Sequence, residues 1–355
     1  MKPRIKPTVA LIFGGRGCEH DVSVEGAKFM LPLIDTERYN PLPILITRCG
    51  EWLTLQDVEA KALPAALTRR VIPSTITPDT TSRGLIDESG RLISIDAIIP
   101  LLHGDHGEDG EIAGVLESSG IPYVGCDVVS GAIAIDKVCT KILAEHLGIP
   151  TARYKLLVTD NRDPGEDYLS ECESALGYPM FVKPARLGSS FGASKANDRP
   201  ELIAAIRTAL ATGEGRILIE RCVNISRELE CAYLSTPERR DVLSIGEIKL
   251  RGSYDFNKKY LDTSTVTLNP RPTLSDAARD KILSYSRRLA TLIGVRDLSR
   301  FDFFEDTDGE ILFNELNTFP GFTASSMYPM LMEVEGISNG ELVSLLISSA
   351  LSRAK

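Results

Sequence analysis

Short apolar runs alternate with helical patterns through the first third of the chain. The runs at 8–13, 41–47 and 93–102 predict β-strands, and the segments 23–34 and 110–119 predict helices. A strand, a helix and a second strand at this spacing favour a parallel sheet with crossover connections. We therefore expect an α/β fold whose N-terminal domain contains a parallel sheet.

Two further groups of elements follow. A helix near 135–147 and the strand YKLLV begin an α/β unit that ends near 220. The last third predicts further strands, a helix near 275–293 and a C-terminal helix. Residues 63–90 predict a surface excursion and 251–262 a polar loop. We therefore predict three domains, with the bounds 1–125, 126–220 and 221–355.

Composition narrows the class of protein. The chain has 355 residues and a net charge of −9, which argues against nucleic acid or an acidic membrane surface as partner. No run approaches the ~18 apolar residues of a membrane span. The seven cysteines are scattered without a Cys-x-x-Cys pair, which is typical of reduced thiols. We therefore expect a cytoplasmic protein.

Two β-rich runs, SRFDFF and ILFNELN, lie on either side of an Asp308-Gly309 turn signal. Asp-Gly favours a two-residue hairpin loop, in which Thr307 would face Glu310. We therefore predict an antiparallel hairpin over residues 299–317.

That register has a chemical consequence. It places Asp302 across from Glu315 and Arg300 across from Asn317, so that the four side chains share one face of the sheet. Opposed carboxylates repel each other, and a divalent cation such as Mg²⁺ removes the conflict. The alternative is a solvated hairpin face whose carboxylates are salt-bridged to Arg300.

The first glycine-rich loop, GGRGCEHDVS, follows a strand and enters a helix. Gly15 and Gly17 match half of a dinucleotide fingerprint, but His20 occupies the third glycine position. The turn could instead direct Glu19 into a cleft at the end of the sheet. A third reading is that Glu19 only favours the helix N-terminus through the macrodipole.

Two more loops follow strands. In VKPARLGSSFG, a lysine at a strand end precedes a small flexible turn, which can surround phosphates with N–H groups and a cation. A solvated β-hairpin has the same composition. In HGDHGEDGEIAG, His103 is either a structural histidine or a substrate contact.

Taken in order, these segments resemble the D-alanine–D-alanine ligase family of ATP-grasp enzymes. The resemblance covers nearly the whole chain and rests on the segments FGGRGCEHDVS, LHGDHGEDG, GIPYVGCD, IDKVCTK, FVKPARLGSSFG, ILIERCV, YDFNKKY, SRFDFF and NELNTFPGFTASSMYP. It implies a three-domain ATP-grasp fold that uses ATP to join two D-alanines through an acyl phosphate, for peptidoglycan precursors. Relatives that make D-Ala–D-Ser or D-Ala–D-lactate share most of these motifs.

The resemblance also implies roles for individual residues. Two Mg²⁺ ions, or Mn²⁺, would be held by Asp302, Glu315 and Asn317. ATP would be contacted by Lys137, Lys183, Ser190, Glu220, Val223, Glu228, Lys259, Phe304 and Asn314. A homodimer is usual for the family, and residues 251–262 would close as a lid.

The amino-acid sites follow from the same resemblance. Glu19 would pair with the first ammonium, linked to Ser189 and Tyr260, and His103 would lie near that substrate. Arg300 and the N–H of Gly321 would form the oxyanion hole. For the second substrate, Ser326 would bind the carboxylate and Met327 would form an apolar wall suited to a methyl group.

Two other functions fit the sequence less well. An NAD-dependent oxidoreductase is disfavoured by the missing third glycine. A nucleotide-binding regulator without chemistry is disfavoured by the joint presence of Glu19, Arg300, Asp302, Glu315 and Asn317. In D-lactate-using relatives a lid histidine repels the ammonium of an amino-acid acceptor. Because 251–262 contains no histidine, the resemblance implies D-alanine as the preferred acceptor, then D-serine, with D-lactate negligible at neutral pH.

Overall fold

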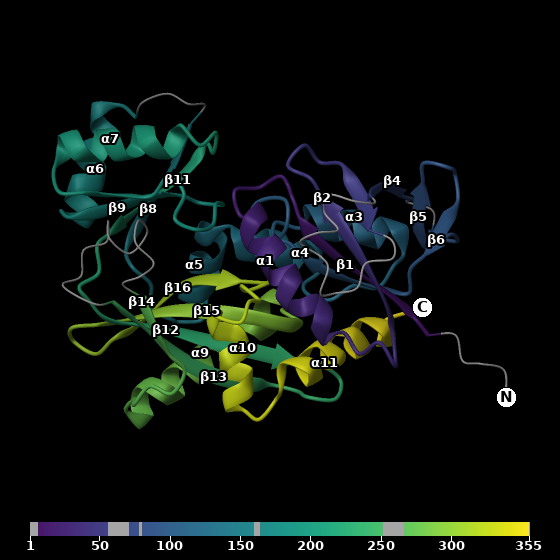
Figure 1. Ribbon diagram of the computed structural model, residues 1–355. Helices are drawn as coiled ribbons and strands as arrows, with labels where there is room; N and C mark the ends of the chain where they lie inside the picture. The colour runs from purple at the N-terminus through teal and green to yellow at the C-terminus, as the bar shows by residue number, and fades with distance from the viewer. Residues whose placement is uncertain (1–5, 56–70, 78–79, 160–163, 251–265, 355) are drawn as a thin grey trace.

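The computed structural model describes residues 6–55, 71–77, 80–159, 164–250 and 266–354. Within these residues the chain forms three sheets with helices packed against them (Figure 1). The α/β class is therefore as predicted.

The N-terminal sheet has seven strands in the order β6-β5-β4-β3-β2-β1-β7. As predicted, β1 pairs in parallel with β2 and β7, but the other pairs are antiparallel. The turn 47–51 between β2 and β3 is too short for a crossover, so it reverses the chain. The strands are β1 (Thr8–Gly14), β2 (Asn40–Ile46), β3 (Trp52–Leu55), β4 (Val71–Ile76), β5 (Gly84–Asp87), β6 (Leu92–Ser94) and β7 (Ala97–Leu101).

Two predictions for this sheet are wrong in detail. The run 93–102 is two strands, because Asp96 binds the edge of β1: its carboxylate accepts the N–H of Thr8 at 2.7 Å. Part of the expected excursion 63–90 belongs to the sheet as β4 and β5. Serine and threonine occur in strands as well as in loops. Here the hydroxyl of Ser74 on β4 forms a hydrogen bond with the hydroxyl of Thr54 on β3 at 2.8 Å.

Helices α1 (His20–Met30) and α3 (Glu111–Ser119) pack against this sheet. The predicted helix 23–34 starts three residues earlier and ends in the 3₁₀ turn η1 (Leu31–Leu33). The buried side chains of α1 lie on one face, which is the helical periodicity expected of a helix on a sheet.

The second sheet has the order β10-β9-β11-β8 and is antiparallel throughout. Two helices bury their apolar faces against it (Figure 1). Its elements are β8 (Tyr154–Val158), α6 (Glu166–Leu176), β9 (Met180–Pro184), β10 (Ser194–Ala196), α7 (Arg199–Leu210) and β11 (Arg216–Arg221). The VKPARLGSSFG segment therefore leaves β9 and returns along β10 as a long hairpin connection.

The third sheet has the order β14-β13-β12-β15-β16 and is also antiparallel. The helix predicted near 135–147 is α5, and a second helix, α4, precedes it. Both contact β16, as does α9. The elements are α4 (Val128–Ile135), α5 (Lys137–His146), β12 (Ile225–Ser235), β13 (Val242–Leu250), β14 (Val266–Asn269), α9 (Asp276–Ile293), β15 (Asp297–Asp306) and β16 (Ile311–Asn317).

The chain ends in α10 (Met327–Val334) and α11 (Asn339–Ser352). In Figure 1 the yellow α11 lies beside the purple N-terminal part, and it contacts β7. Leu342 and Leu346 of α11 share one buried apolar cluster with Val9 and Leu11 of β1. The N-terminal sheet and the C-terminal helix thus share one core, and the three domains with their bounds stay a prediction. Across the described ranges, no helix is both long and apolar enough to span a membrane.

Candidate active site

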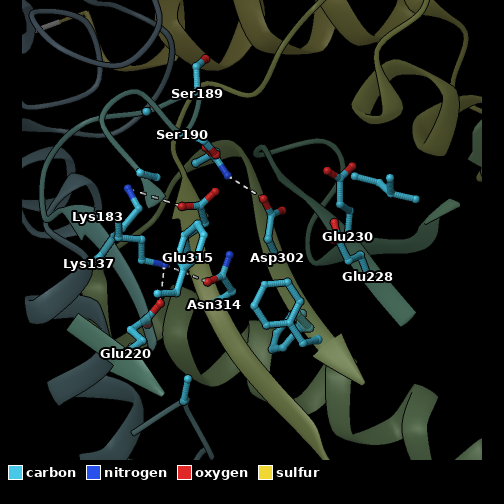
Figure 2. Close-up of a pocket in the computed structure, with 18 of the residues that line it drawn as sticks. Lys137, Lys183, Ser189, Ser190, Glu220, Glu228, Glu230, Asp302, Asn314 and Glu315 are labelled. Atoms are coloured by element: carbon cyan, nitrogen blue, oxygen red, sulfur yellow. Dashed lines mark hydrogen bonds and ion pairs between the residues drawn. The ribbon is translucent and has the colours of Figure 1, made fainter. Parts of the chain in front are cut away.

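A cavity of about 750 Å³ lies where the glycine-rich loops meet the third sheet. One wall is the β15–β16 hairpin, and another is the loop 187–191 (Figure 2). Glu19 and His103 from the N-terminal part line it as well. Segments far apart in the sequence therefore converge on one hollow.

The hairpin loop has three residues rather than the predicted two. It closes where the N–H of Asp306 donates to the carbonyl of Glu310 at 3.0 Å. Gly309 has φ 78°, a left-handed conformation that glycine adopts without strain. The predicted pairing of Thr307 with Glu310 is therefore wrong, because Asp-Gly here closes a longer turn.

A β-bulge corrects the register farther along the hairpin. The odd loop alone would set Asp302 opposite Asn314. The register instead shifts by one residue, so Asp302 faces Glu315 and Arg300 faces Asn317, as predicted. The bulge also brings Asn314 to the cavity wall beside Glu315. Sequence alternation alone would have placed these neighbours on opposite faces.

The Asp302 carboxylate accepts hydrogen bonds from two other side chains on the same face of the hairpin. Arg300 donates two hydrogen bonds to its carboxylate, each 2.7 Å, and Asn317 Nδ2 donates a third at 3.0 Å. The salt bridge of the alternative reading is thus present, but the face is not solvated, since the Asp302 side chain is 14% exposed. Arg300 also lies 3.2 Å from Glu230, a cavity-lining carboxylate that sequence reasoning missed.

Two lysines face this hairpin from other elements. Lys137, the first residue of α5, lies 3.4 Å from Glu315 and donates to the carbonyl of Leu187 at 2.9 Å. Lys183 at the end of β9 donates to Asn314 Oδ1 at 3.3 Å. Burial alone would raise the pKa of Glu315, but Lys137, Lys183 and Arg300 lower it, so the carboxylate is ionised.

Glu220 is held by a pair of lysines. Its carboxylate lies 2.7 Å from Lys141 and 2.8 Å from Lys183. Burial would raise the pKa of Glu220, yet the two lysines hold it well below its usual value. Lys141 was not singled out from the sequence, although it lies one helical turn beyond Lys137 on the same helix.

Glu19 points into the cavity rather than capping its helix. It makes no side-chain cap bond to α1, and Ser189 Oγ donates to it at 2.6 Å. Gly104 and Gly188 leave space for the Glu19 carboxylate. A Cβ atom added at Gly104 would lie 2.1 Å from Glu19 Oε2, and one added at Gly188 would lie 2.9 Å from it. The predicted link between Glu19 and Ser189 is therefore present.

His103 and Glu108 tie the loop after β7 to the turn after β16. His103 Nδ1 donates to the carbonyl of Phe319 at 2.9 Å, which leaves Nε2 as the acceptor nitrogen. Nε2 is buried with no hydrogen-bond partner in the described parts of the chain. Glu108 accepts N–H bonds from Phe319 at 2.7 Å and Gly104 at 2.9 Å. The sequence reasoning gave Glu108 no role.

The remaining sequence-predicted residues divide into three groups. The cavity lining includes Ser190, Val223, Glu228, Phe304 and Gly321. Ser326 and Met327 are not part of that lining: Ser326 bonds Thr323, and Met327 is buried in the core. Lys259, Tyr260 and the proposed lid 251–262 lie outside the described residues.

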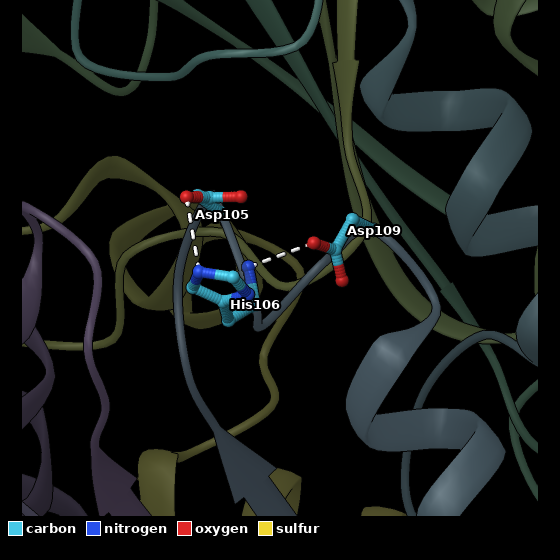
Figure 3. A group of neighbouring side chains, drawn as sticks. All are labelled: Asp105, His106 and Asp109. Carbon is cyan, nitrogen blue, oxygen red and sulfur yellow. Dashed lines mark hydrogen bonds and ion pairs between the residues drawn. The ribbon is translucent and has the colours of Figure 1, made fainter. Parts of the chain in front are cut away.

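Asp105, His106 and Asp109 form a second polar cluster (Figure 3). The oxygens of Asp109 accept the N–H groups of His106 at 2.8 Å and Glu111 at 2.9 Å, and His106 lies 2.7 Å from Glu111. These bonds fold the loop 104–110 onto the start of α3. We therefore interpret the cluster as part of the loop's framework.

Comparison with known proteins identifies the family. Two family models match in tandem, "D-ala D-ala ligase N-terminus" over residues 8–126 and "D-ala D-ala ligase C-terminus" over 143–348. The chain belongs to the D-alanine–D-alanine ligase family. Its ATP-grasp fold is thereby confirmed, and the oxidoreductase alternative is wrong.

Members of the family match over almost their full length. A D-alanine–D-alanine ligase of Caldicellulosiruptor bescii is 40% identical, covering 98% of this chain and 96% of its own. One of Synechococcus is 38% identical over 97% and 98%. The solved VanG D-Ala:D-Ser ligase of Enterococcus faecalis is 32% identical with a TM-score of 0.86, covering 97% and 99%.

Proposed function

We propose that this chain joins two D-alanines at the expense of ATP, through an acyl phosphate, for peptidoglycan precursor synthesis. The observation that carries the proposal is that groups suited to a phosphate and a group suited to an ammonium line one cavity. Lys137, Lys183 and the carboxylate–amide hairpin line it together with Glu19 and His103. Such a cavity can hold a polyphosphate and an ammonium-bearing acid together.

Mg²⁺ fits the hairpin. Asp302, Glu315 and Asn317 offer two carboxylates and an amide oxygen, the hard ligands that Mg²⁺ prefers. Glu315 is ionised, and donation by Asn317 Nδ2 to Asp302 leaves the Asn317 Oδ1 as an acceptor. When bound, the metal would neutralise phosphate charge. Manganese has the same ligand preference.

The nucleotide would lie between the second and third sheets. Lys137, Lys183 and the backbone of Ser190 would contact phosphates, with Lys259 added from beyond the described residues. Glu220, Val223, Phe304 and Asn314 would surround the base, and Glu228 would bind the ribose. In support, all of these except Lys259 line the cavity.

The first D-alanine would lie beside Glu19. Its ammonium would pair with Glu19, which Ser189 orients, and Tyr260 would join them. Arg300 and the N–H of Gly321 would hold the oxygen that gains charge during attack. Exclusion of water matters, because water would hydrolyse the acyl phosphate.

The second substrate is the finer question. Ser326 would bind its carboxylate, and Met327 would shape its side-chain pocket from within the core. The alternative is D-serine, the acceptor named for the similar VanG enzyme. We favour D-alanine because an apolar wall gives a hydroxyl no partner, although such a wall rejects it only mildly.

The test is ADP release from the purified chain with ATP, Mg²⁺ and D-alanine, D-serine or D-lactate at pH 7. We expect the highest kcat/KM with D-alanine, a lower value with D-serine and almost none with D-lactate. A higher kcat/KM for D-serine would make the chain a D-Ala–D-Ser ligase. No ADP release with any acceptor would refute the ligase proposal.

We place this activity in the cytoplasm, where ATP is available and where seven unpaired cysteines persist. The substrates are small molecules, with neither nucleic acid nor a membrane as partner. A homodimer is the assembly we expect from the family.

A further inference from the structure

The carboxylate of Glu220 lies between a lysine of the protein interior and a lysine of the cavity wall. It lies near the end of β11, and its two oxygens have different partners. Oε1 lies 2.7 Å from Lys141 Nζ, and Oε2 lies 2.8 Å from Lys183 Nζ. Glu220 and Lys183 line the cavity, whereas Lys141 is not part of that lining (Figure 2).

Lys141 is a fixed partner. Its side chain is 0% exposed, and its ammonium lies 5.6 Å from the ring centroid of Tyr154. A buried ammonium with one carboxylate beside it cannot leave without stranding both charges. Burial lowers the pKa of Lys141, but the carboxylate of Glu220 opposes that shift, so the two charges support each other. Because Lys141 is not part of the cavity lining, we expect it to stay paired with Glu220 when a ligand enters.

Lys183 is an exchangeable partner. Its ammonium lies at the cavity wall between Glu220 Oε2 and Asn314 Oδ1. A lysine carries three donors on a flexible stem, so it can turn toward a nearby anion. A phosphate group entering the cavity competes with Glu220 for it.

We propose that Lys183 exchanges Glu220 for phosphate when a nucleotide binds, and that the released Oε2 accepts a hydrogen bond from an amino group on the base. This inference rests on the proposed function, since it needs ATP in this cavity. Lys141 acts as the positioning residue, because it keeps Glu220 charged and in place during the exchange. Recognition of the phosphate and of the base are then one coupled event.

The proposed exchange predicts opposite changes in nucleotide and nucleoside affinity. A nucleoside without phosphate must compete with Lys183 for Oε2, whereas a nucleotide supplies the anion that draws Lys183 away. Removing Lys183 should therefore weaken nucleotide binding and strengthen nucleoside binding. A lysine that only attracts phosphate would affect the nucleotide alone.

The experiment measures equilibrium binding of ADP, adenosine and inosine to the full chain and its Lys183→Met variant. We expect ADP affinity to fall about tenfold or more, the effect of one charge-assisted hydrogen bond. Adenosine affinity should rise several-fold. Inosine affinity should not change, because inosine carries a carbonyl in place of the amino group.

Lys137→Met is the matched control. Lys137 faces the same cavity, but its carboxylate partner is Glu315. Its loss should weaken ADP binding without strengthening adenosine binding. An adenosine gain in both variants would mean that the cavity had simply become more open, and would overturn the exchange.

Lys141→Met tests the positioning role. Combined with Lys183→Met, it should abolish the adenosine gain, because Glu220 then has no cation to keep it ionised. A purely structural Lys141 would lower the unfolding midpoint but leave the adenosine gain intact, and that result would overturn its assigned role. If the double variant does not fold, the single Lys183→Met variant still decides the exchange.

The remaining outcomes separate this inference from the proposed function. Unchanged or weaker adenosine binding by Lys183→Met, or an equal gain for inosine, overturns the exchange while nucleotide binding stands. Failure of the wild-type chain to bind ADP overturns the nucleotide site itself.

Discussion

Glu315 is one of the two hairpin carboxylates that we propose as metal ligands. Glu315→Gln keeps the shape of the side chain and its place opposite Asp302. We expect the fold to persist and kcat to fall by orders of magnitude, because one charged metal ligand is lost. Steady-state ADP release measures the effect.

Glu310→Gln on the same hairpin is its control. Glu310 is exposed near the loop, so its replacement should leave ADP release unchanged. Wild-type turnover by a folded Glu315→Gln variant would remove the metal role of this residue.

Glu108 should give stability a measurable pH dependence. Burial raises its pKa to about 7 from the ordinary 4.5, although two backbone N–H groups favour the ionised form. The folded state therefore holds a proton that the unfolded chain releases above pH 4.5. The favourable contribution of Glu108 is complete below pH 4.5 and disappears as the pH rises to about 7.

The Glu108→Gln variant should lack this pH dependence of stability. Between pH 4.5 and 7 its free energy of unfolding should rise relative to wild type by an amount on the order of 3 kcal/mol. Denaturant unfolding at several pH values measures it. A difference that stays constant over this interval would mean that Glu108 is ionised throughout.

Single residues were predictable where a motif exposed their chemistry. The glycine-rich turn offered the cavity position of Glu19 as one of its readings. The pairing of Asp302 with Glu315 was predicted correctly, but from a two-residue loop that the structure does not have. Glu108, Lys141 and Glu230 did not, because their roles depend on burial and on partners more than a hundred residues away or on another element. The pattern of polar and apolar residues along the chain indicates neither burial nor distant partners.

Among the elements, α5 presents a clear test through its N-cap. Asp136 accepts the N–H groups of Val138 and Cys139, and its other oxygen pairs with Arg186, which precedes the loop 187–191. Asp136→Ala should cost about 1–2 kcal/mol of stability. It should also weaken ADP binding, because α5 begins with Lys137.

Asp198→Ala offers a matched comparison. Asp198 caps α7 through the N–H of Glu201 and is not among the cavity-lining residues, but it is exposed, whereas Asp136 is buried and pairs with Arg186 and Arg216. Unfolding experiments should therefore show a smaller loss of stability, and titration should show unchanged ADP affinity. If both variants bind ADP with equal affinity, the N-cap of α5 does not influence the nucleotide site.

The elements themselves were largely predictable, since most strands and helices follow apolar periodicity. The exceptions have local causes. Asp96 divides one apolar run, and the turn 47–51 reverses the chain into β3, a strand that was not predicted. The hairpin is the most instructive case: Asp302 faces Glu315 only because the bulge at Asn314 compensates for an odd loop. Neither the loop length nor the bulge can be read from alternation.

At the scale of the whole molecule, Arg353 fastens the end of α11 to two other parts of the chain. It donates to buried Asp297 at 2.6 Å and to the carbonyl of Tyr123 at 2.6 Å. Arg353→Met should lower the free energy of unfolding by about 2–3 kcal/mol, because it leaves a buried carboxylate without its cation. The Arg353 side chain is 28% exposed, so we expect less than the full buried-pair effect.

Arg239→Met is the corresponding control at the other end of α11. Arg239 pairs with Glu341 at 3.3 Å, but both side chains are exposed. Its loss should change stability by less than about 1 kcal/mol. Denaturant unfolding compares the two, and equal small effects would mean that Arg353 does not fasten the helix.

The shared cluster of β1 and α11 constrains the order of events during synthesis. The N-terminal sheet is translated before the other two sheets, but α11, which helps to cover its apolar face, is translated after them. That face must wait, exposed or held by a chaperone, until α11 has been made. The N-terminal sheet therefore cannot complete its folding when it first emerges, even though domains generally fold in the order in which they emerge.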